Sequence, residues 1–174
     1  MSDLIEVASY ARGEWVAPKG GATLHDAGTG TPVAVAGAEG LDVLAMAEFA
    51  RTVGGPALRA LSFHDRARML KALAQHLNAN KAELERLSHL TGATAADNAF
   101  DIDGGIGTLF VMASKGRREM PDSDLFLDGE VESLSRSGAF LGRHVCTPLQ
   151  GVAVHVNAFN FPVWGMLEKL APAI

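Results

Sequence analysis

The segment from Gly151 to Pro162 constrains the fold of this chain most strongly. It reads Gly-Val-Ala-Val-His-Val-Asn-Ala-Phe-Asn-Phe-Pro, a short apolar run rich in valine followed by two asparagines and a proline. Such runs are typical of strands buried on both faces of a parallel sheet, and proline is favoured in the first turn of a helix. We therefore expect a strand over 151–156, a polar turn, and a helix from Pro162, which together indicate an α/β fold.

Asn157 and Asn160 lie where the expected strand ends. In open α/β sheets, ligands bind beyond the carboxyl ends of the strands. A neutral amide there can donate a hydrogen bond to an oxygen that gains negative charge during a reaction. The same amides could instead satisfy backbone groups at the turn. Spacing alone leaves both interpretations open.

Most of the region from residue 39 to residue 120 is expected to be helical. Ser62 precedes apolar residues at helical spacing, and Asp65 follows it by three positions, which predicts a helix that begins with a capping box. Another helix is expected from Asn80 until it is stopped near Gly92. An alanine-rich helix over 41–53 is expected to end at the following Gly-Gly-Pro.

Strands are expected on both sides of this helical region. Tyr10 and Trp15 flank a turn-prone Arg-Gly-Glu, and the loop 28–32 separates two strand-like runs, 22–24 and 33–35. The glycines of that loop could suggest a phosphate-binding loop, but no helix follows and no Lys-Ser/Thr closes it, so a hairpin turn is expected. Residues 121–138 predict an exposed connection with one short strand, and 140–145 predict another strand.

Three aspartates, Asp97, Asp101 and Asp103, precede Gly104 in a pattern that resembles part of a calcium-binding loop. With Gly104 at the sixth loop position, however, alanine and phenylalanine occupy the first and twelfth positions, where ligands are required. We expect these carboxylates to be helix-terminal or solvated.

The remaining patterns also indicate structural roles. Gly105 and Gly107 have the spacing of a dinucleotide-binding fingerprint but no preceding strand, so close helix packing is expected. The six histidines form no zinc-binding pattern, and no metal site is expected. Cys146, the single cysteine, follows His144 by two residues with nothing to activate it. We expect it to be a buried or half-buried structural residue.

Composition excludes several classes of partner. The chain has 174 residues, 48% hydrophobic and 20% charged, with a net charge of −5 and no dense basic cluster. Nucleic acid and anionic membrane surfaces are therefore not expected as partners. No apolar run approaches the roughly 20 residues of a membrane span, and the acidic start does not match a signal peptide, so a cytoplasmic protein is expected. The apolar end at Ile174 indicates a fragment of a longer chain.

The segment Ala158-Phe159-Asn160-Phe161-Pro162 resembles the Pro-Trp-Asn-Phe-Pro signature of the aldehyde dehydrogenase superfamily. The chain is most similar to the branch that acts in phenylacetate and benzoyl-CoA degradation. The likeness extends over nearly the whole sequence. It also rests on the segments 57–61, 91–94, 101–109 and 164–172.

The resemblance implies a domain organisation. Residues 1–120 would be the N-terminal part of a cofactor-binding domain, and 121–149 would be strands of an oligomerisation element. Residues 150–174 would hold the first Rossmann-like strand and the start of the next helix. A homo-oligomer is the implied assembly of the full-length protein.

The resemblance also implies a chemistry. Asn160 would help to form the oxyanion hole, and Asn157, Ala158 and Phe159 would lie beside the nicotinamide of NADP or NAD. The substrate would be a small aldehyde, expected to be linked to coenzyme A. The family's catalytic cysteine and glutamate lie downstream of the motif, so this chain alone is expected to be inactive. The alternative is a non-catalytic assembly module.

Overall fold

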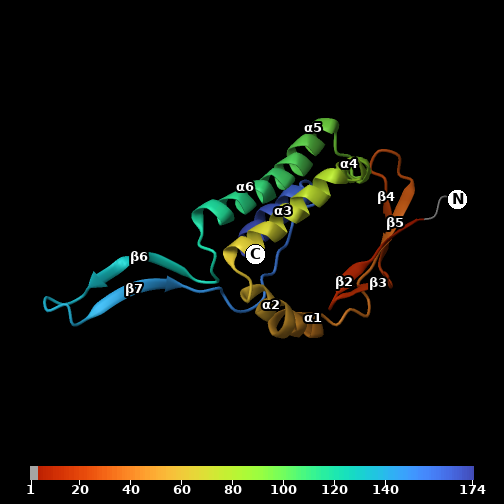
Figure 1. The fold of residues 1–174 in the computed structure, drawn as a ribbon. Coiled ribbons are helices and arrows are strands. Elements are labelled where there is room, and N and C mark those ends of the chain that lie inside the picture. The colour runs from red at the N-terminus through yellow and green to blue at the C-terminus, as the bar shows by residue number, and fades with distance from the viewer. Residues whose placement is uncertain (1–3) are drawn as a thin grey trace.

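The computed structural model describes residues 4–174, which form a helical body, a strand-rich N-terminal part and a projecting hairpin (Figure 1). The strands are β1 (Ile5–Val7), β2 (Ser9–Ala11), β3 (Glu14–Val16), β4 (Ala22–His25), β5 (Pro32–Ala36), β6 (Phe126–Ser133) and β7 (Leu141–Cys146). The α-helices are α1 (Val43–Phe49), α2 (Gly55–Arg59), α3 (Phe63–Ala79), α4 (Lys81–His89), α5 (Ala95–Asn98), α6 (Gly104–Glu119) and α7 (Pro162–Ala173). Two π-helical turns, η1 (Ala50–Gly54) and η2 (Ala99–Asp103), join α1 to α2 and α5 to α6. Helices and sheets are thus mixed, as expected for the α/β class.

The N-terminal strands form two small sheets. In the first, β5 lies between β1, to which it is parallel, and β4, to which it is antiparallel. The loop from β4 to β5 is the expected hairpin turn, with the Asp26 carboxylate accepting hydrogen bonds of 2.8 Å from the backbone N–H groups of Gly28 and Thr29. In the second, Tyr10 of β2 pairs with Trp15 of β3, with ring centroids 5.0 Å apart. This hairpin is also confirmed.

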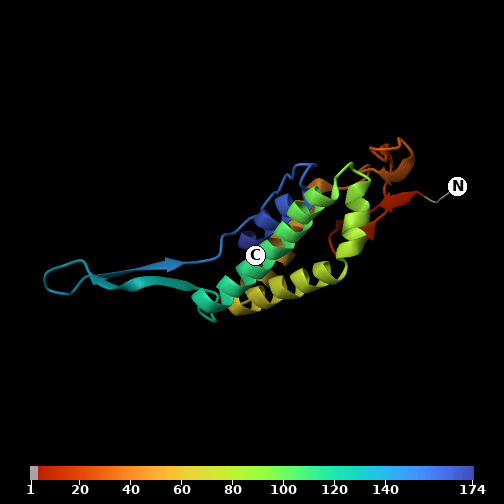
Figure 2. The same cartoon turned by 90° about the horizontal axis from the view of Figure 1, so that it is seen from above.

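Helices α3, α6 and α7 lie side by side and enclose the hydrophobic core (Figures 1 and 2). Helix α3 begins at the expected capping box, in which Ser62 and Asp65 bond to each other's backbone N–H groups. The core consists of apolar residues from these helices and from η2, namely Leu70, Ala74, Ile102, Ile106, Leu109, Ala113, Leu167 and Ala171. This body carries the start of α7, where the asparagine motif lies.

The helix expected over 41–53 does not stop at Gly-Gly-Pro. It continues from α1 through η1 into α2, and the Gly55 N–H bonds to the Ala50 carbonyl, five residues back. A proline inside a regular helix clashes with the carbonyl four residues earlier. Here Pro56 directly follows the π turn and lies in the first turn of α2.

Strands β6 and β7 form an antiparallel hairpin that projects away from the helical body (Figure 1). The expected strand before residue 138 is longer than predicted and covers Phe126–Ser133. Apolar side chains are exposed on both strands, among them Leu127, Val131 and Val145. Cys146 ends β7 and is exposed, so the prediction of a buried or half-buried cysteine was wrong. A two-stranded ribbon with no layer packed on it buries neither face.

The strand expected over 151–156 is not formed. These residues follow the hairpin as a chain without strand pairing, and Val154 and Val156 are 81% and 85% exposed. A strand needs a neighbour to supply the hydrogen bonds of its ladder. No strand among residues 4–174 pairs with this run. Within the same residues, no helix combines the length and apolar character needed to cross a membrane.

Candidate active site at the start of the last helix

The candidate site is the segment Asn157–Pro162, which leads into α7. The structure places Asn157, Ala158, Phe159 and Asn160 consecutively and exposes all four, with Phe159 91% accessible. Neither the Asn157 nor the Asn160 side chain makes a hydrogen bond to another residue in the described part of the chain. The amides therefore do not satisfy backbone groups at the turn, which was the structural alternative.

The start of α7 has an unusual cap. A helix leaves its first backbone N–H groups without partners inside the helix, and they are often satisfied by a Ser, Thr, Asp or Asn side chain at the N-cap. Here the N-cap residue is Phe161, which has no side-chain acceptor, and Pro162 has no N–H to satisfy. The Gly165 N–H donates to the Phe161 carbonyl at 2.9 Å. Only Val163 and Trp164 need an outside acceptor.

Asp101 supplies that acceptor from another helix. Its Oδ1 accepts from the Trp164 backbone N–H at 2.7 Å and its Oδ2 from the Val163 backbone N–H at 3.2 Å. Asp101 lies in η2 and is only 3% exposed. A carboxylate at this position also faces the positive end of the α7 dipole. The start of α7 is thereby fixed to the chain that enters α6.

The three aspartates of the Asp97–Asp103 cluster thus have different roles. Asp97 forms a capping box with Thr94 at the start of α5, and these hydrogen bonds lower the pKa of Asp97. Asp103 is exposed and pairs with Lys81 at 2.6 Å, which raises the pKa of Lys81. Asp97 and Asp103 thus match the expectation that these carboxylates are helix-terminal or solvated. Asp101 does not match it, because it is buried and caps a helix distant in the sequence.

Close packing of two glycines completes the attachment of α7 to α6. A β-carbon on Gly104 would lie 2.7 Å from Trp164 Cε3, and one on Gly105 would lie 3.1 Å from Trp164 Cα. The prediction that this glycine run serves close helix packing is confirmed for Gly105. Gly107 has no such contact, since a β-carbon there would meet nothing within 4 Å.

The other end of α7 is held by Arg66. This residue of α3 is 8% exposed, and its Nη1 donates to the Ile174 carbonyl at 3.2 Å. Its guanidinium also lies 4.6 Å above the centre of the Phe63 ring. A cation is favourable near the C-terminal end of a helix dipole. Asp101 and Arg66 are thus two buried charged residues that contact α7, at Val163–Trp164 and at Ile174.

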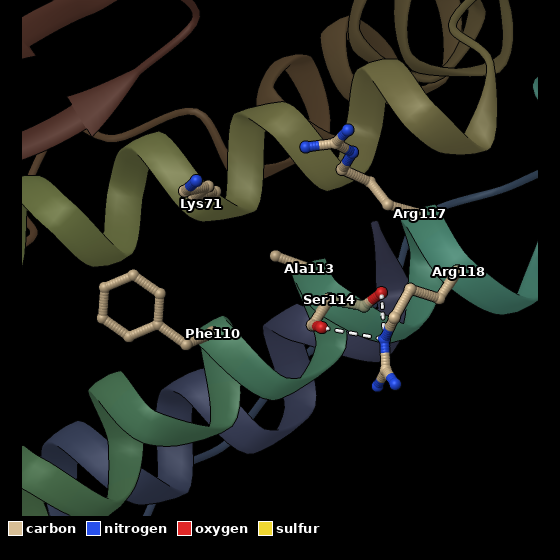
Figure 3. A pocket seen from close by; sticks show the side chains of 6 residues that line it. All are labelled: Lys71, Phe110, Ala113, Ser114, Arg117 and Arg118. Carbon is tan, nitrogen blue, oxygen red and sulfur yellow. Dashed lines mark hydrogen bonds between the residues drawn. The ribbon is translucent and has the colours of Figure 1, made fainter.

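A basic groove lies apart from the asparagine segment, between α3 and α6 (Figure 3). It has a volume of about 320 Å³ and is lined by Lys71, Phe110, Ala113, Ser114, Arg117 and Arg118. The Arg118 Nε donates to the Ser114 hydroxyl at 3.1 Å. None of these residues belongs to the Asn157–Pro162 segment, so the groove adds nothing to the candidate site.

Sequence reasoning missed Asp101, although a signal for it exists. The motif places an aromatic residue at the N-cap and a proline directly after it, so the helix has no local cap. An uncapped helix start near a packed core requires an acceptor from elsewhere in the fold. An aspartate within the apolar stretch before α6 is a suitable candidate.

Comparison with known proteins agrees with the resemblance at the asparagine motif. The family model described as the aldehyde dehydrogenase family matches residues 15–174. The chain belongs to this family. It is 42% identical over 172 residues to the 3,4-dehydroadipyl-CoA semialdehyde dehydrogenase of Aromatoleum evansii. The match covers 98% of this chain and 33% of that relative, so the chain spans about a third of the relative's length.

Proposed function

We propose that this chain is the segment of an NAD(P)-dependent aldehyde dehydrogenase that stabilises the oxyanion and borders the nicotinamide. The substrate class is a CoA-linked semialdehyde of aromatic catabolism, such as the phenylacetate route, which is oxidised to a carboxylic acid. The observation that carries the proposal is the free amide of Asn160, two residues before a helix whose start is fixed by the buried Asp101. The low cysteine content favours the cytoplasm as the site of this activity.

The role of Asn160 follows from the chemistry of aldehyde oxidation. When a thiolate attacks the aldehyde carbon, the carbonyl oxygen becomes an oxyanion. A preorganised amide N–H stabilises that charge more strongly than it stabilises the neutral carbonyl of the substrate. The Asn160 side chain suits this role because it is exposed and makes no hydrogen bond within residues 4–174.

The residues just before Asn160 suit a nicotinamide. Phe159 offers an exposed aromatic face, and Asn157 offers an exposed amide that can pair with a carboxamide. When bound, NADP or NAD would accept the hydride that leaves the substrate carbon. Asn157, Ala158 and Phe159 would orient its ring, and Asn160 would hold the substrate oxygen.

The nucleophile and the general base belong to another part of the enzyme. Cys146 is the last residue of β7, at the base of the β6–β7 hairpin opposite Phe126, and it lies outside the segment Asn157–Pro162. We propose that the catalytic cysteine and glutamate come from sequence equivalent to the two thirds of the relative outside the match. Residues 1–120 and 150–174 would then belong to the cofactor-binding domain, and 151–156 would join its sheet.

The β6–β7 hairpin favours a second role in assembly. It exposes apolar side chains on both strands, and a free β-ribbon can pair with strands of another subunit. We propose that residues 121–149 contribute to a homo-oligomer. The competing function is that of a non-catalytic assembly module. In that case Asn160 would not stabilise an oxyanion.

A chimera tests the proposal. This chain replaces the matching third of the Aromatoleum evansii dehydrogenase, and reduction of NADP or NAD is followed with 3,4-dehydroadipyl-CoA semialdehyde. The unmodified relative serves as the control. We expect the chimera to oxidise the aldehyde, because the chain supplies the equivalent of the replaced segment. A folded chimera that binds the cofactor but leaves the aldehyde unoxidised would support the assembly function instead.

A further inference from the structure

We propose that Asp101 is the positioning residue for the Asn160 amide. Its buried carboxylate fixes the first turn of α7 and thereby the place from which Asn160 meets the substrate oxygen. This inference rests on the proposed function, because it takes Asn160 as the oxyanion donor. It adds a residue 59 positions earlier in the chain to that site.

The connection from Asp101 to Asn160 is short. Asp101 holds the backbone N–H groups of Val163 and Trp164, three and four residues after Asn160. Pro162 lies between them and restricts its own φ and the conformation of the residue before it. A shift of the first turn of α7 would therefore be passed directly to Asn160.

Asp101 is itself held in place by the core. Its neighbour Ile102 is fully buried in the core formed by α3, α6 and α7. Both residues lie in η2, and π-helical turns of this kind occur often at functional sites. The additional residue in such a turn changes the direction of its side chains relative to a regular helix. The carboxylate of Asp101 is directed at α7 from this turn.

The cap is specific to the start of α7. The described helices α1, α3 and α5 are capped by a side chain directly before them, namely Asp42, Ser62 and Thr94. A serine or aspartate at position 161 could cap α7 in the same way. The cap instead comes from Asp101 in η2, directly before α6. It therefore fixes α7 relative to α6 as well as accepting from the first backbone N–H groups of α7. Asp101 forms no ion pair within residues 4–174, and the nearby Lys81 pairs with Asp103 and Glu85.

A double-mutant cycle in the chimera separates positioning from simple stabilisation. The four proteins are the chimera, Asp101→Asn, Asn160→Ala and the double variant, each measured for kcat, KM, cofactor Kd and melting temperature. Asn at position 101 keeps the size of the side chain but places an amide NH₂ against one of the two backbone donors. We expect Asp101→Asn to lower kcat between about 10- and 100-fold, as small displacements of catalytic groups do. We expect KM and Kd to change less than about twofold.

The double variant shows whether Asp101 affects catalysis through Asn160. If Asp101 acts through Asn160, adding Asp101→Asn to Asn160→Ala lowers kcat no further. If Asp101→Asn lowers kcat by the same factor in both backgrounds, or leaves kcat unchanged, the positioning role is wrong. If Asn160→Ala itself leaves kcat unchanged, the oxyanion assignment is wrong and the Asp101 proposal fails with it. These patterns distinguish failure of the inference from failure of the proposed function.

Asp97→Asn is the matched control. It makes the same chemical change four residues earlier and weakens the hydrogen bonds that the Asp97 carboxylate accepts from the Thr94 backbone N–H and hydroxyl at the start of α5, without touching α7. We expect it to lower the melting temperature and leave kcat unchanged; an equal loss of kcat would overturn the inference. If Asp101→Asn does not fold, Asp101→Ser keeps an acceptor oxygen and takes its place in the cycle. Independently, amide exchange in the unmodified 174-residue chain must show protected Val163 and Trp164 amides, and fast exchange of both would overturn the inference.

Discussion

The indole of Trp164 lies directly against the backbone of Gly104, so that a β-carbon on Gly104 would come within 2.7 Å of Trp164 Cε3. This contact allows α7 to approach α6 closely enough for Asp101 to reach the first N–H groups of α7. The glycine and the aspartate therefore act together. One removes a steric barrier, and the other supplies the hydrogen bonds.

We predict that Gly104→Ala destabilises the chain, whereas Gly107→Ala in the same helix stabilises it. The first change adds a methyl group where the indole ring lies, and overpacking of this kind costs about 1–3 kcal/mol. The second adds a methyl group in open space and improves helix propensity by about 0.5–1 kcal/mol. Urea unfolding of both variants checks this. Equal effects of the two substitutions would mean that α7 does not pack on Gly104.

We predict that the chain loses stability as the pH falls below about 4. Hydrogen bonds from the backbone N–H groups of Thr29 and Gly28 lower the pKa of Asp26. The Arg68 and Ser62 side chains lower the pKa of Asp65. A carboxyl with a lower pKa in the folded state stabilises that state above its unfolded pKa, and this contribution is lost as the pH falls through the folded pKa.

Melting temperatures between neutral and acidic pH check the prediction. Asp26→Asn should melt lower than the unmodified chain at neutral pH, and the difference should shrink in acid. A difference that stays constant across this range would contradict the contribution of the Asp26 carboxylate.

Local sequence patterns predicted much of the fold, but contacts between distant residues could not be predicted. The Ser62–Asp65 capping box and the Tyr10–Trp15 hairpin depend on neighbours within a few positions, so their patterns were sufficient. The strand expected over 151–156 depends on partner strands, and hydrophobic pattern alone does not supply them.

For the candidate site, the motif predicted where the asparagines and the helix start would lie, and the family assignment is confirmed. It did not predict Asp101, because that carboxylate caps a helix more than sixty residues later. The local sequence of the Asp97–Asp103 cluster does not distinguish the buried Asp101 from its exposed neighbours. The roles of Asn157, Ala158, Phe159 and Asn160 remain predictions.

We predict that the purified 174-residue chain has no aldehyde dehydrogenase activity. The proposed mechanism assigns the nucleophile and the base to sequence outside this chain. The chain is assayed with NADP, NAD and a panel of aldehydes, with the Aromatoleum evansii dehydrogenase as the positive control. Turnover that survives repurification would show that the chain contains its own nucleophile.

We predict that Cys146→Ser in the chimera leaves kcat within about twofold of the unsubstituted chimera. Cys146 is exposed at the end of β7, outside the segment that carries the candidate site. Its thiol should be accessible to alkylating reagents in the folded chain, because Cys146 is exposed. Loss of turnover in the serine variant would reassign the nucleophile.

The oxyanion role of Asn160 is tested by comparing Asn160→Ala with Asn157→Ala in the chimera, with kcat, cofactor Kd and melting temperature measured on the same samples. We predict that Asn160→Ala lowers kcat by about 10²–10³, as loss of one oxyanion donor does, and leaves the Kd of the oxidised cofactor nearly unchanged. Asn157→Ala should raise that Kd more than it lowers kcat. A folded Asn160→Ala variant that turns over normally, whatever its melting temperature, would show that Asn160 does not stabilise the oxyanion.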